Sequence, residues 1–345
     1  MQSTTIAVDL AKSVFQIAVS HRPGAVAETH RLTRSQFLRF FAERKPALVL
    51  FEACGTSHFW ARQLQGIGHQ VLLLPPHQIR PYVRGNKTDQ ADAKALLEAH
   101  RNDQIRCVPV KSVAQQTLTA LHRLRSAWMG ERTARINLVR GILRELGLPI
   151  AVGARHVIPR VLALIAEPAG ELPEPLSLML AEACQEIRDL EARIKAVEKQ
   201  LRALAAQLPV VERLQSIPGV GLLTSTALVA FVGDVLRFST GRHFASYLGL
   251  TPREHSSGLR RHLGSISQRG DPYLRMLLIH GARAALLAAK RLKQPDRLRT
   301  WALVVEKRRG HNKTTVALAN KLARIVWAVW RRDVAFESRA AIAAA

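Results

Sequence analysis

Four carboxylates occupy positions from which they could act together on a phosphate group. Asp9 and Glu52 each close an apolar run, TTIAVD and PALVLFE, and Asp89 and Asp92 stand three residues apart in KTDQADAKALLEA. Carboxylates gathered from separate elements are how proteins hold Mg²⁺ or Mn²⁺ against phosphate oxygens. Two such ions can stabilise both the attacking and the leaving oxygen of a phosphodiester. The four acids are therefore a candidate metal site.

Each acid also has a structural explanation when it is taken alone. Asp89 can cap a helix that has Asp92 in its first turn, Asp9 can be a turn residue, and Glu52 can pair with a buried arginine or lysine. Like charges brought close together without a metal would repel one another. It is the combination of four acids in a strongly basic protein that favours a metal site.

The elements that must position these acids have the pattern of a mixed α/β domain. Apolar runs and turn residues predict three strands, followed by helix, strand, helix, strand and helix. Strand ends in such a sheet converge on one crevice, and a spacing of three residues places Asp89 and Asp92 on one helix face. The expected strands are 4–11, 14–21, 25–33, 47–53 and 69–76, and the expected helices are 35–44, 57–68 and one that begins near residue 89.

Beyond this domain the sequence predicts two long helices, 111–146 and 176–207, joined by a connector rich in Pro, Gly and Ala at 147–175. In the second helix apolar residues recur at spacings of three and four, a coiled-coil-like stripe that suits either an internal bundle or self-association. The stripe consists of Leu190, Ile194, Val197, Leu201 and Leu204. The predicted domains are 1–105, a helical spacer at 106–208, and a mostly helical part at 209–345.

A helix-hairpin-helix is predicted where IPGVG (217–221) separates two apolar helical stretches. Gly219 and Gly221 would let the backbone come close to a phosphate, and the helix that follows would present its N-terminus to it. The alternative is a tight turn with a purely structural role.

Charge is the strongest signal in the composition. The 345 residues include 51 Lys and Arg against 26 Asp and Glu, a net charge of +25. Residues 241–345 hold 21 of these basic residues and six of the acidic ones, so this part of the chain carries +15 of the net charge. A fold does not need this imbalance, which favours an anionic polymer such as nucleic acid over a solvated basic face or a membrane-surface patch.

Other features exclude several classes of protein. A hydrophobic content of 48% describes a globular chain and not a disordered one. Cys54, Cys107 and Cys184 lack metal-ligand spacing, so a zinc ribbon or finger is not expected, and they suit reduced thiols. With neither a signal-peptide pattern nor a membrane span, we expect no membrane partner and a cytoplasmic location beside the bacterial nucleoid.

The segments around the acids resemble the Asp-Glu-Asp-Asp domain of the IS110/IS1111 transposases. They are AVDLAKSVFQIAV, LFEACGTSHFWARQL and GNKTDQADAKALLEA. The C-terminal half resembles the same family in LQSIPGVGLLTSTALVAFVGD and FASYLGLTPREHSSGLRRHLGSISQRGDPYLRMLLIHGARAAL. The resemblance covers nearly the whole chain, and it implies a RuvC-like, ribonuclease-H-like domain, a helical spacer and a C-terminal transposase domain.

The resemblance also implies a catalytic serine that precedes a glycine in the C-terminal domain. In EHSSG (254–258), Ser257 is the better match and Ser256 the alternative. Taken without the family, this segment is better explained as a surface turn in a basic loop, and only the resemblance favours Ser257 as the nucleophile. A serine that attacks phosphorus needs cations for the developing charge. The basic residues expected to contact phosphate are Arg260, Arg261, Arg269, Lys307, Arg308 and Arg309.

These features predict an insertion-sequence DNA recombinase with a phosphoserine intermediate and Mg²⁺ or Mn²⁺ at the four acids. The resemblance implies donor and target double-stranded DNA as partners, and a noncoding guide RNA encoded by the element. Exchange of several strands favours a homo-oligomer, a dimer or tetramer, in which acids and serine meet across a domain or subunit interface. The alternatives are a RuvC-like metal-dependent nuclease or junction resolvase, and a non-enzymatic nucleic-acid-binding protein.

Overall fold

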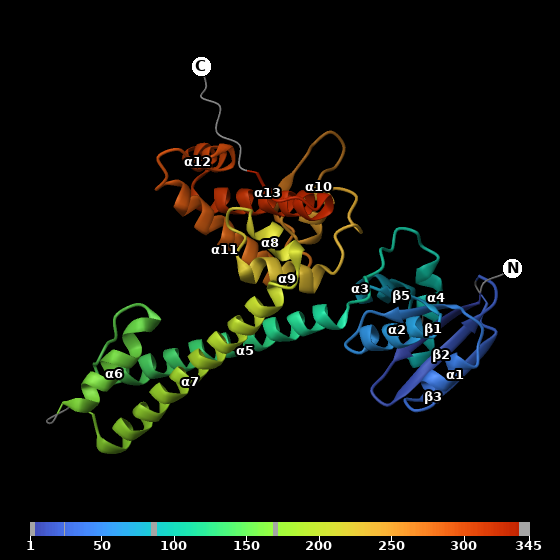
Figure 1. The fold of residues 1–345 in the computed structure, drawn as a ribbon, viewed down its shortest axis with the longest axis horizontal. Helices are drawn as coiled ribbons and strands as arrows, with labels where there is room; N and C mark the ends of the chain where they lie inside the picture. The colour runs from blue at the N-terminus through green and yellow to red at the C-terminus, as the bar shows by residue number, and fades with distance from the viewer. Residues whose placement is uncertain (1–3, 24, 84–87, 168–171, 338–345) are drawn as a thin grey trace. The chain divides into compact units, whose positions relative to one another are not determined.

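A five-stranded mixed sheet organises the N-terminal part of the chain in the computed structural model, which describes residues 4–23, 25–83, 88–167 and 172–337 (Figure 1). The strand order is β3-β2-β1-β4-β5. The first three strands pair antiparallel, whereas β1 with β4 and β4 with β5 are parallel. The strands are β1 (Thr5–Leu10), β2 (Val14–Ser20), β3 (Glu28–Thr33), β4 (Leu48–Glu52) and β5 (Gln70–Leu74).

The helices of this part follow the predicted order, with one short helix added after β5. The mixed α/β class and the sequence of three strands, helix, strand, helix, strand and helix are confirmed, and they are consistent with the RuvC-like fold that the resemblance implies. The helices are α1 (Phe37–Ala42), α2 (Ser57–Gly66), α3 (Pro76–Ile79) and α4 (Asp89–His100).

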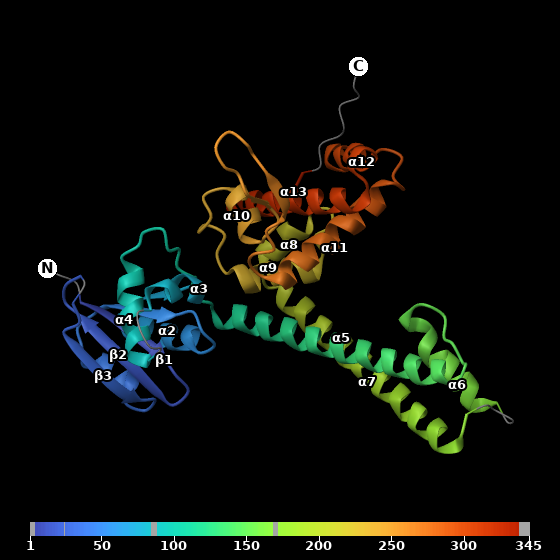
Figure 2. The same ribbon diagram turned by 180° about the vertical axis from the view of Figure 1, so that it is seen from behind.

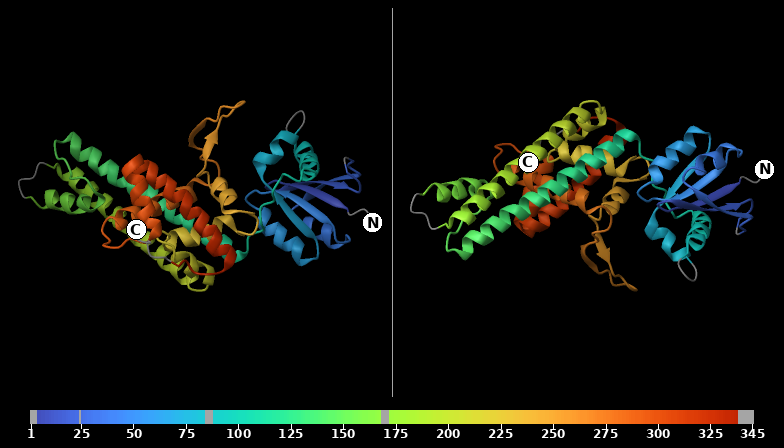
Figure 3. Two further views of the ribbon diagram at one scale, coloured as in Figure 1. Left: turned by 90° about the horizontal axis from the view of Figure 1, so that it is seen from above. Right: turned by 90° about the horizontal axis from the view of Figure 1, so that it is seen from below.

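Helices cover both faces of the sheet (Figure 3) because alternate side chains of each strand point to opposite faces. On one face, Phe15 packs with Phe37 of α1 and Trp60 of α2, with ring centroids 4.8 and 5.4 Å from that of Phe15. On the other face, Ala7 and Leu50 pack in a cluster with residues of α4. Two separate apolar layers therefore fix the sheet between its helices.

Backbone contacts divide the chain into two compact units, Met1–Ala114 and Gln115–Ala345. The second unit contains both the predicted spacer and the predicted C-terminal part. The division into 1–105, 106–208 and 209–345 as separately folding domains stays a prediction.

Two long helices, α5 (Val113–Glu145) and α7 (Glu174–Ala205), run side by side (Figures 1 and 2). Arg125 of α5 pairs with Glu198 of α7 at 2.7 Å. Two further Arg–Glu pairs join the same helices, Arg132 with Glu191 and Arg135 with Glu186. Four residues of the predicted stripe are buried within the chain, namely Leu190, Ile194, Val197 and Leu201. The stripe therefore serves packing inside one chain.

The segment between the two long helices contains a helix that the sequence did not predict. It contains α6 (Val157–Ala166), whose residues Val157, Val161 and Leu164 are buried in a cluster shared with α5 and α7. Pro159 is compatible with the helix because it lies in the first turn, where backbone N–H groups have no partner within the helix. The Pro, Gly and Ala content of the segment concealed this apolar face.

The rest of the second unit is mostly helical, as predicted, and its helices share one apolar core. None of the helices in the described ranges combines the length and the apolar character that crossing a bilayer requires. The elements are α8 (Pro209–Gln215), α9 (Leu222–Val232), α10 (Gly241–Tyr247), β6 (Pro252–Glu254), β7 (Leu263–Ile266), α11 (Pro272–Ala289), α12 (Arg297–Arg309) and α13 (His311–Arg332).

Candidate active site and nucleic-acid interface

Strand alternation places Asp9 and Glu52 on the sheet face that α4 covers. Asp9 follows Ala7 by two residues and Glu52 follows Leu50 by two, so each acid shares a face with a residue of the α4 cluster. Their strands are parallel neighbours, and Val8 stands opposite Phe51 in the register just before them. The two acids therefore leave the sheet at the same edge and on the same side.

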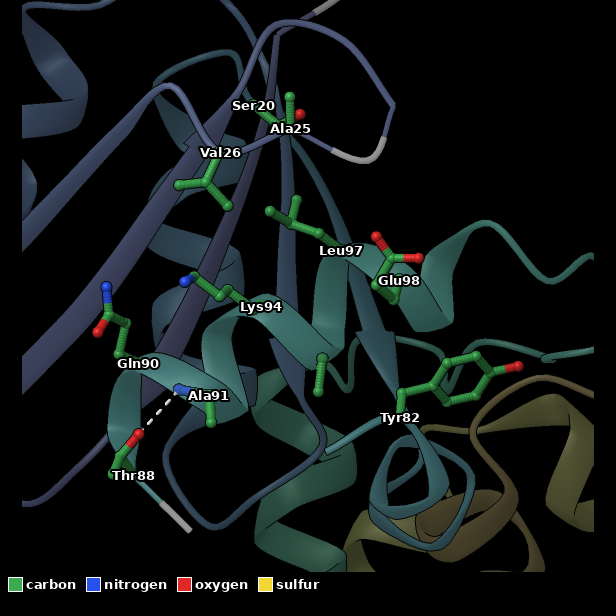
Figure 4. Close-up of a pocket in the computed structure, with 11 residues that line it drawn as sticks. Ser20, Ala25, Val26, Tyr82, Thr88, Gln90, Ala91, Lys94, Leu97 and Glu98 are labelled. Atoms are coloured by element: carbon green, nitrogen blue, oxygen red, sulfur yellow. Dashed lines mark hydrogen bonds between the residues drawn. The ribbon is translucent and has the colours of Figure 1, made fainter. Parts of the chain in front are cut away.

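The other two acids lie in the first turn of α4. The cap of this helix is Thr88, whose hydroxyl accepts a hydrogen bond from the N–H of Ala91 at 3.2 Å (Figure 4). Thr88 thus fills the capping role that was the structural alternative for Asp89. Asp92 stands four residues before the buried Leu96, which places it on the helix face that packs on the sheet.

All four acids line one open cavity of about 830 Å³ in the first unit. Two further polar residues of its wall, His77 and Arg80, were missed from the sequence. They follow β5, the parallel neighbour of β4, so the rule that strand ends converge on one crevice would have found them. The remaining lining residues are Pro76, Ile79 and Val83.

The chemistry of this donor set fits a divalent cation, because Mg²⁺ and Mn²⁺ prefer carboxylate oxygens. Within the described ranges, no group of three or more His, Cys, Asp or Glu residues is already arranged to hold a metal ion. The acids thus share a cavity without forming a closed coordination shell. The resemblance of their segments to the Asp-Glu-Asp-Asp type of domain implies a divalent metal, and the roles of the individual acids as ligands stay a prediction.

A second cavity of the same unit, about 660 Å³, contains none of the four acids. Figure 4 shows Gln90 and Lys94 of α4 at this cavity, with Val26 across from them. Its other labelled residues are Ser20, Ala25, Tyr82, Thr88, Ala91, Leu97 and Glu98. The chemistry-bearing carboxylates predicted from the sequence belong to the first cavity alone.

The segment that carries the two candidate serines folds as an exposed hairpin of the second unit, drawn in orange in Figure 3. Its strands β6 and β7 are antiparallel, and beyond them Ser257 and Arg260 exchange backbone hydrogen bonds of 3.2 and 3.1 Å. Gly258 opens the two-residue loop with a φ of +55°, a conformation that favours glycine. The surface turn and the exposed serine are thus features of the same loop.

The two serines have different surroundings. The hydroxyl of Ser256 donates to the Glu254 carboxylate at 2.7 Å and accepts the backbone N–H of His262 at 3.2 Å. The pKa of Glu254 is lowered, first by this hydrogen bond and then by the charge of Arg261. Across the described part of the chain, the Ser257 hydroxyl makes no hydrogen bond. The hydroxyl of Ser256 therefore has a structural role between the strands, whereas Ser257 contributes to the turn through its backbone alone.

The turn between α8 and α9 contains the two glycines that were predicted to approach phosphate. Gly219 has a φ of +86°, and a Cβ at this position would lie 2.4 Å from the carbonyl oxygen of Gly281 in α11. Close packing inside the unit therefore explains Gly219. Gly221 is exposed at the N-cap of α9, with no atom within 4 Å of a Cβ built there. Of the two, only Gly221 offers open backbone at a helix N-terminus.

The six predicted phosphate-binding cations are all exposed. Arg260 and Arg261 belong to the hairpin, Arg269 lies just after it, and the others form the last turn of α12. Cations in a final turn also stabilise a helix through its dipole, so Lys307, Arg308 and Arg309 have a structural explanation as well. Nucleic-acid contact by these residues stays a prediction.

Comparison with known proteins assigns both parts of the chain to transposases. A family model described as the IS116/IS110/IS902 transposase family matches residues 211–297, and a transposase model of the Asp-Glu-Asp-Asp IS110 type matches residues 6–147. A probable family 20 transposase of Pseudomonas aeruginosa is 42% identical over 338 residues, 97% of this chain and 99% of the relative.

Two other relatives are a second transposase and a gene-inverting protein. The transposase of insertion sequence element IS1111A from Coxiella burnetii is 39% identical, over 95% of this chain and 90% of the relative. A pilin gene-inverting protein of Moraxella lacunata is 32% identical over 127 residues, 36% of this chain and 38% of that protein. The expected likeness to the IS110 and IS1111 transposases is thereby confirmed.

Proposed function

The chain belongs to the IS110 family of transposases, and from this premise we propose that it cuts and rejoins double-stranded DNA through a phosphoserine intermediate at Ser257. Transposases are enzymes that cleave and rejoin DNA. The observation that carries the proposal is the exposed Ser257, which precedes Gly258 in the hairpin loop and whose hydroxyl makes no hydrogen bond to any residue that the structure describes.

In the proposed first step, the Ser257 oxygen attacks a phosphorus atom of the DNA backbone. The new bond joins the serine oxygen to phosphorus, and the bond from phosphorus to the 3′ oxygen breaks. The serine loses its proton and the 3′ oxygen gains one, so the cut strand ends in a free hydroxyl. In the second step a 3′ hydroxyl attacks the phosphoserine, which restores the serine and rejoins the DNA. Arg260 and Arg261, which are exposed on the same hairpin, would bind phosphate oxygens beside it.

The four acids of the first unit would hold Mg²⁺ or Mn²⁺ in their shared cavity. Such an ion supplies positive charge to phosphate oxygens during cleavage. Without a cation, four carboxylates would repel the DNA backbone that the basic second unit attracts. The cavity common to Asp9, Glu52, Asp89 and Asp92 supports this part of the proposal.

A noncoding guide RNA and a homo-oligomer complete the proposal. Both rest on the family and on the need to cut and exchange several strands. The acids and the serine belong to different units of the chain, and acting on one phosphate would require them to meet. Since the α7 stripe is buried within its own chain, an oligomer would use other surfaces.

The proposal is tested by trapping protein–DNA adducts on denaturing gels. The full-length protein should form an adduct with Mg²⁺ and duplex DNA bearing the element's ends. Ser257→Ala should abolish it while nucleic-acid binding stays nearly intact, and Ser256→Ala should retain it. Cleavage without an adduct would favour the metal-dependent nuclease. A non-enzymatic binder would yield neither an adduct nor cleaved DNA, and Asp9→Asn would then have no effect in a recombination assay with Mg²⁺.

A further inference from the structure

The tip of the serine hairpin exposes an apolar side chain that the fold does not need. Leu259 is fully exposed, with a relative accessibility of 107%. The turn is already fixed by Gly258 and by the backbone pair between Ser257 and Arg260. A single exposed leucine is common on protein surfaces. This one stands out because it projects at the end of an arm, two residues from the proposed nucleophile.

The surroundings of this leucine suit a phosphate backbone. Arg253, Arg260 and Arg261 are exposed on the same hairpin. Its single acid, Glu254, is already engaged by Arg261 at 3.2 Å and by Ser256. Arginines that bind phosphates beside an apolar wedge are the combination by which proteins unstack base pairs and kink a duplex.

We propose that the hairpin Pro252–Ile266 enters a groove of duplex DNA and that Leu259 inserts between two base pairs beside the phosphate attacked by Ser257. The inference rests on the proposed function for the identity of that phosphate. Two-stranded ribbons can enter either groove of B-form DNA, and apolar wedges insert from the minor groove, so we place the arm in the minor groove. The minor groove of an RNA duplex is wide and shallow, and it would not hold such an arm between its walls.

Insertion at this point has a consequence for the reaction. Unstacking one step opens the backbone locally, and it exposes the phosphodiester to an attacking oxygen on the same loop. Leu259 would thus be a positioning residue, which presents the DNA to Ser257 without touching the reacting atoms. Flexible pyrimidine–purine steps unstack most easily, so the arm should prefer them.

The first experiment measures unstacking without any reaction. The full-length protein, with Ser257→Ala to prevent chemistry, is mixed with a 30-base-pair duplex that carries 2-aminopurine beside a central TA step. Fluorescence should rise on binding. Leu259→Ala should lose most of this rise and keep its DNA affinity within roughly three-fold, because the phosphate contacts remain. Leu259→Phe should retain it. Leu236→Ala, which removes another exposed leucine outside the hairpin, is the matched control.

The second experiment measures adduct formation with Ser257 intact. Leu259→Ala should slow adduct formation on a fully paired duplex by roughly ten-fold or more, from the lost burial of one leucine. A mismatch placed beside the cleaved phosphate should restore the rate, since that step is already unstacked. A structural defect in the hairpin would not be rescued in this way.

Two results of the fluorescence experiment would overturn the wedge. One is an unchanged fluorescence rise in Leu259→Ala, and the other is a response to an RNA duplex in place of DNA. The outcomes also separate the two proposals. A fluorescence rise that depends on Leu259, in a protein that forms no adduct, would support the wedge and refute the phosphoserine. Adducts formed at the same rate by Leu259→Ala and wild type would do the reverse.

Discussion

At the scale of residues, the acid cavity places four negative charges against one face of a small sheet. Asp9 and Glu52 come from neighbouring strands, and Asp89 and Asp92 come from the first turn of α4. The N-terminus of a helix partly offsets negative charge, but it acts on the two helix acids and not on those of the strands. A bound divalent cation would offset all four, and its binding should therefore stabilise the folded protein.

Removing one acid of the cavity should weaken this stabilisation. Thermal unfolding of the wild type is expected to shift upward as Mn²⁺ is added, because a ligand that binds only the folded state raises its stability. Asp92→Asn should raise the Mn²⁺ concentration needed for half the shift by roughly ten-fold, since affinity follows ligand charge. Glu98→Gln is the matched control, because Glu98 lies on the same helix outside this cavity. Equal responses of the two variants would contradict the metal site.

A buried histidine in the second unit gives a second, pH-dependent feature. His122 of α5 is completely buried, with Nδ1 at 3.0 Å from the Tyr273 hydroxyl and Nε2 at 3.0 Å from the Thr226 hydroxyl. Thr226 donates its own proton to the carbonyl of Leu222. The hydrogen-bond network therefore assigns the proton of His122 to Nε2 and an acceptor role to Nδ1. Burial, and then the charge of Arg125, lowers the pKa of His122 to about 4.

This histidine should make the second unit less stable in acid. The unfolded chain binds the His122 proton below pH ~6.5, whereas the folded chain does so only near pH 4. Stability is therefore full above pH ~6.5 and falls by up to ~3 kcal/mol as the pH drops toward 4. His122→Gln should show a shallower pH dependence in urea unfolding. Tryptophan fluorescence can follow this unfolding in a Trp60→Phe background, because the remaining tryptophans all lie in the second unit. If the stability of His122→Gln and that of the wild type fell in parallel with pH, the pH dependence could not be assigned to His122.

At the scale of elements, the sequence was informative wherever apolar periodicity was strong. The five strands, α2, α4 and both long helices were predicted, and all of them except β3 bury an apolar face. The four acids could be found because strand ends and a helix start are recognisable positions. Alternation from Ala7 to Asp9 and from Leu50 to Glu52 then decides which face they share.

Other elements could not be predicted because local composition hides what tertiary packing decides. α6 lies in a segment rich in Pro and Gly, and its apolar face is defined only by α5 and α7. The hairpin β6–β7 is almost wholly exposed, so it has no hydrophobic alternation to reveal it. The close packing of Gly219 against Gly281 could not be predicted, because Gly281 lies on a helix some 60 residues away in the sequence. The phosphate contact expected of Gly219 stays a prediction.

The turn between α8 and α9 offers a matched pair of substitutions. Gly219→Ala should destabilise the second unit by roughly 2–4 kcal/mol, because it combines a positive φ with a clash against Gly281. Gly221→Ala meets no neighbour and should change stability by less than about 1 kcal/mol. Urea unfolding measures both. If backbone at the turn binds phosphate, Gly221→Ala should lower DNA affinity while remaining stable. A stable Gly219→Ala protein would contradict the packing explanation.

At the scale of the whole molecule, the uneven positive charge predicts how DNA binding responds to salt. Each phosphate contact contributes about −0.9 to the slope of log K against log salt concentration. Neutralising the last turn of α12 should therefore flatten the slope by up to about three. A control variant that loses three positive charges from exposed positions of α7 should leave the slope unchanged. If both variants flatten the slope equally, the charge acts through the overall field of the protein and not through contacts of α12. The triples are Lys307, Arg308 and Arg309, and Arg193, Lys195 and Lys199, each replaced by alanine.

The proposed recombination depends on one covalent bond, between the DNA backbone and the hairpin of the second unit. The most direct measurement is peptide mapping by mass spectrometry of the adduct formed by the full-length protein with Mg²⁺ and DNA carrying the element's ends. After nuclease and protease digestion, we expect a nucleotide remnant on the oxygen of Ser257. A remnant on Ser256, or cleaved and rejoined DNA with no remnant on any serine, would contradict it.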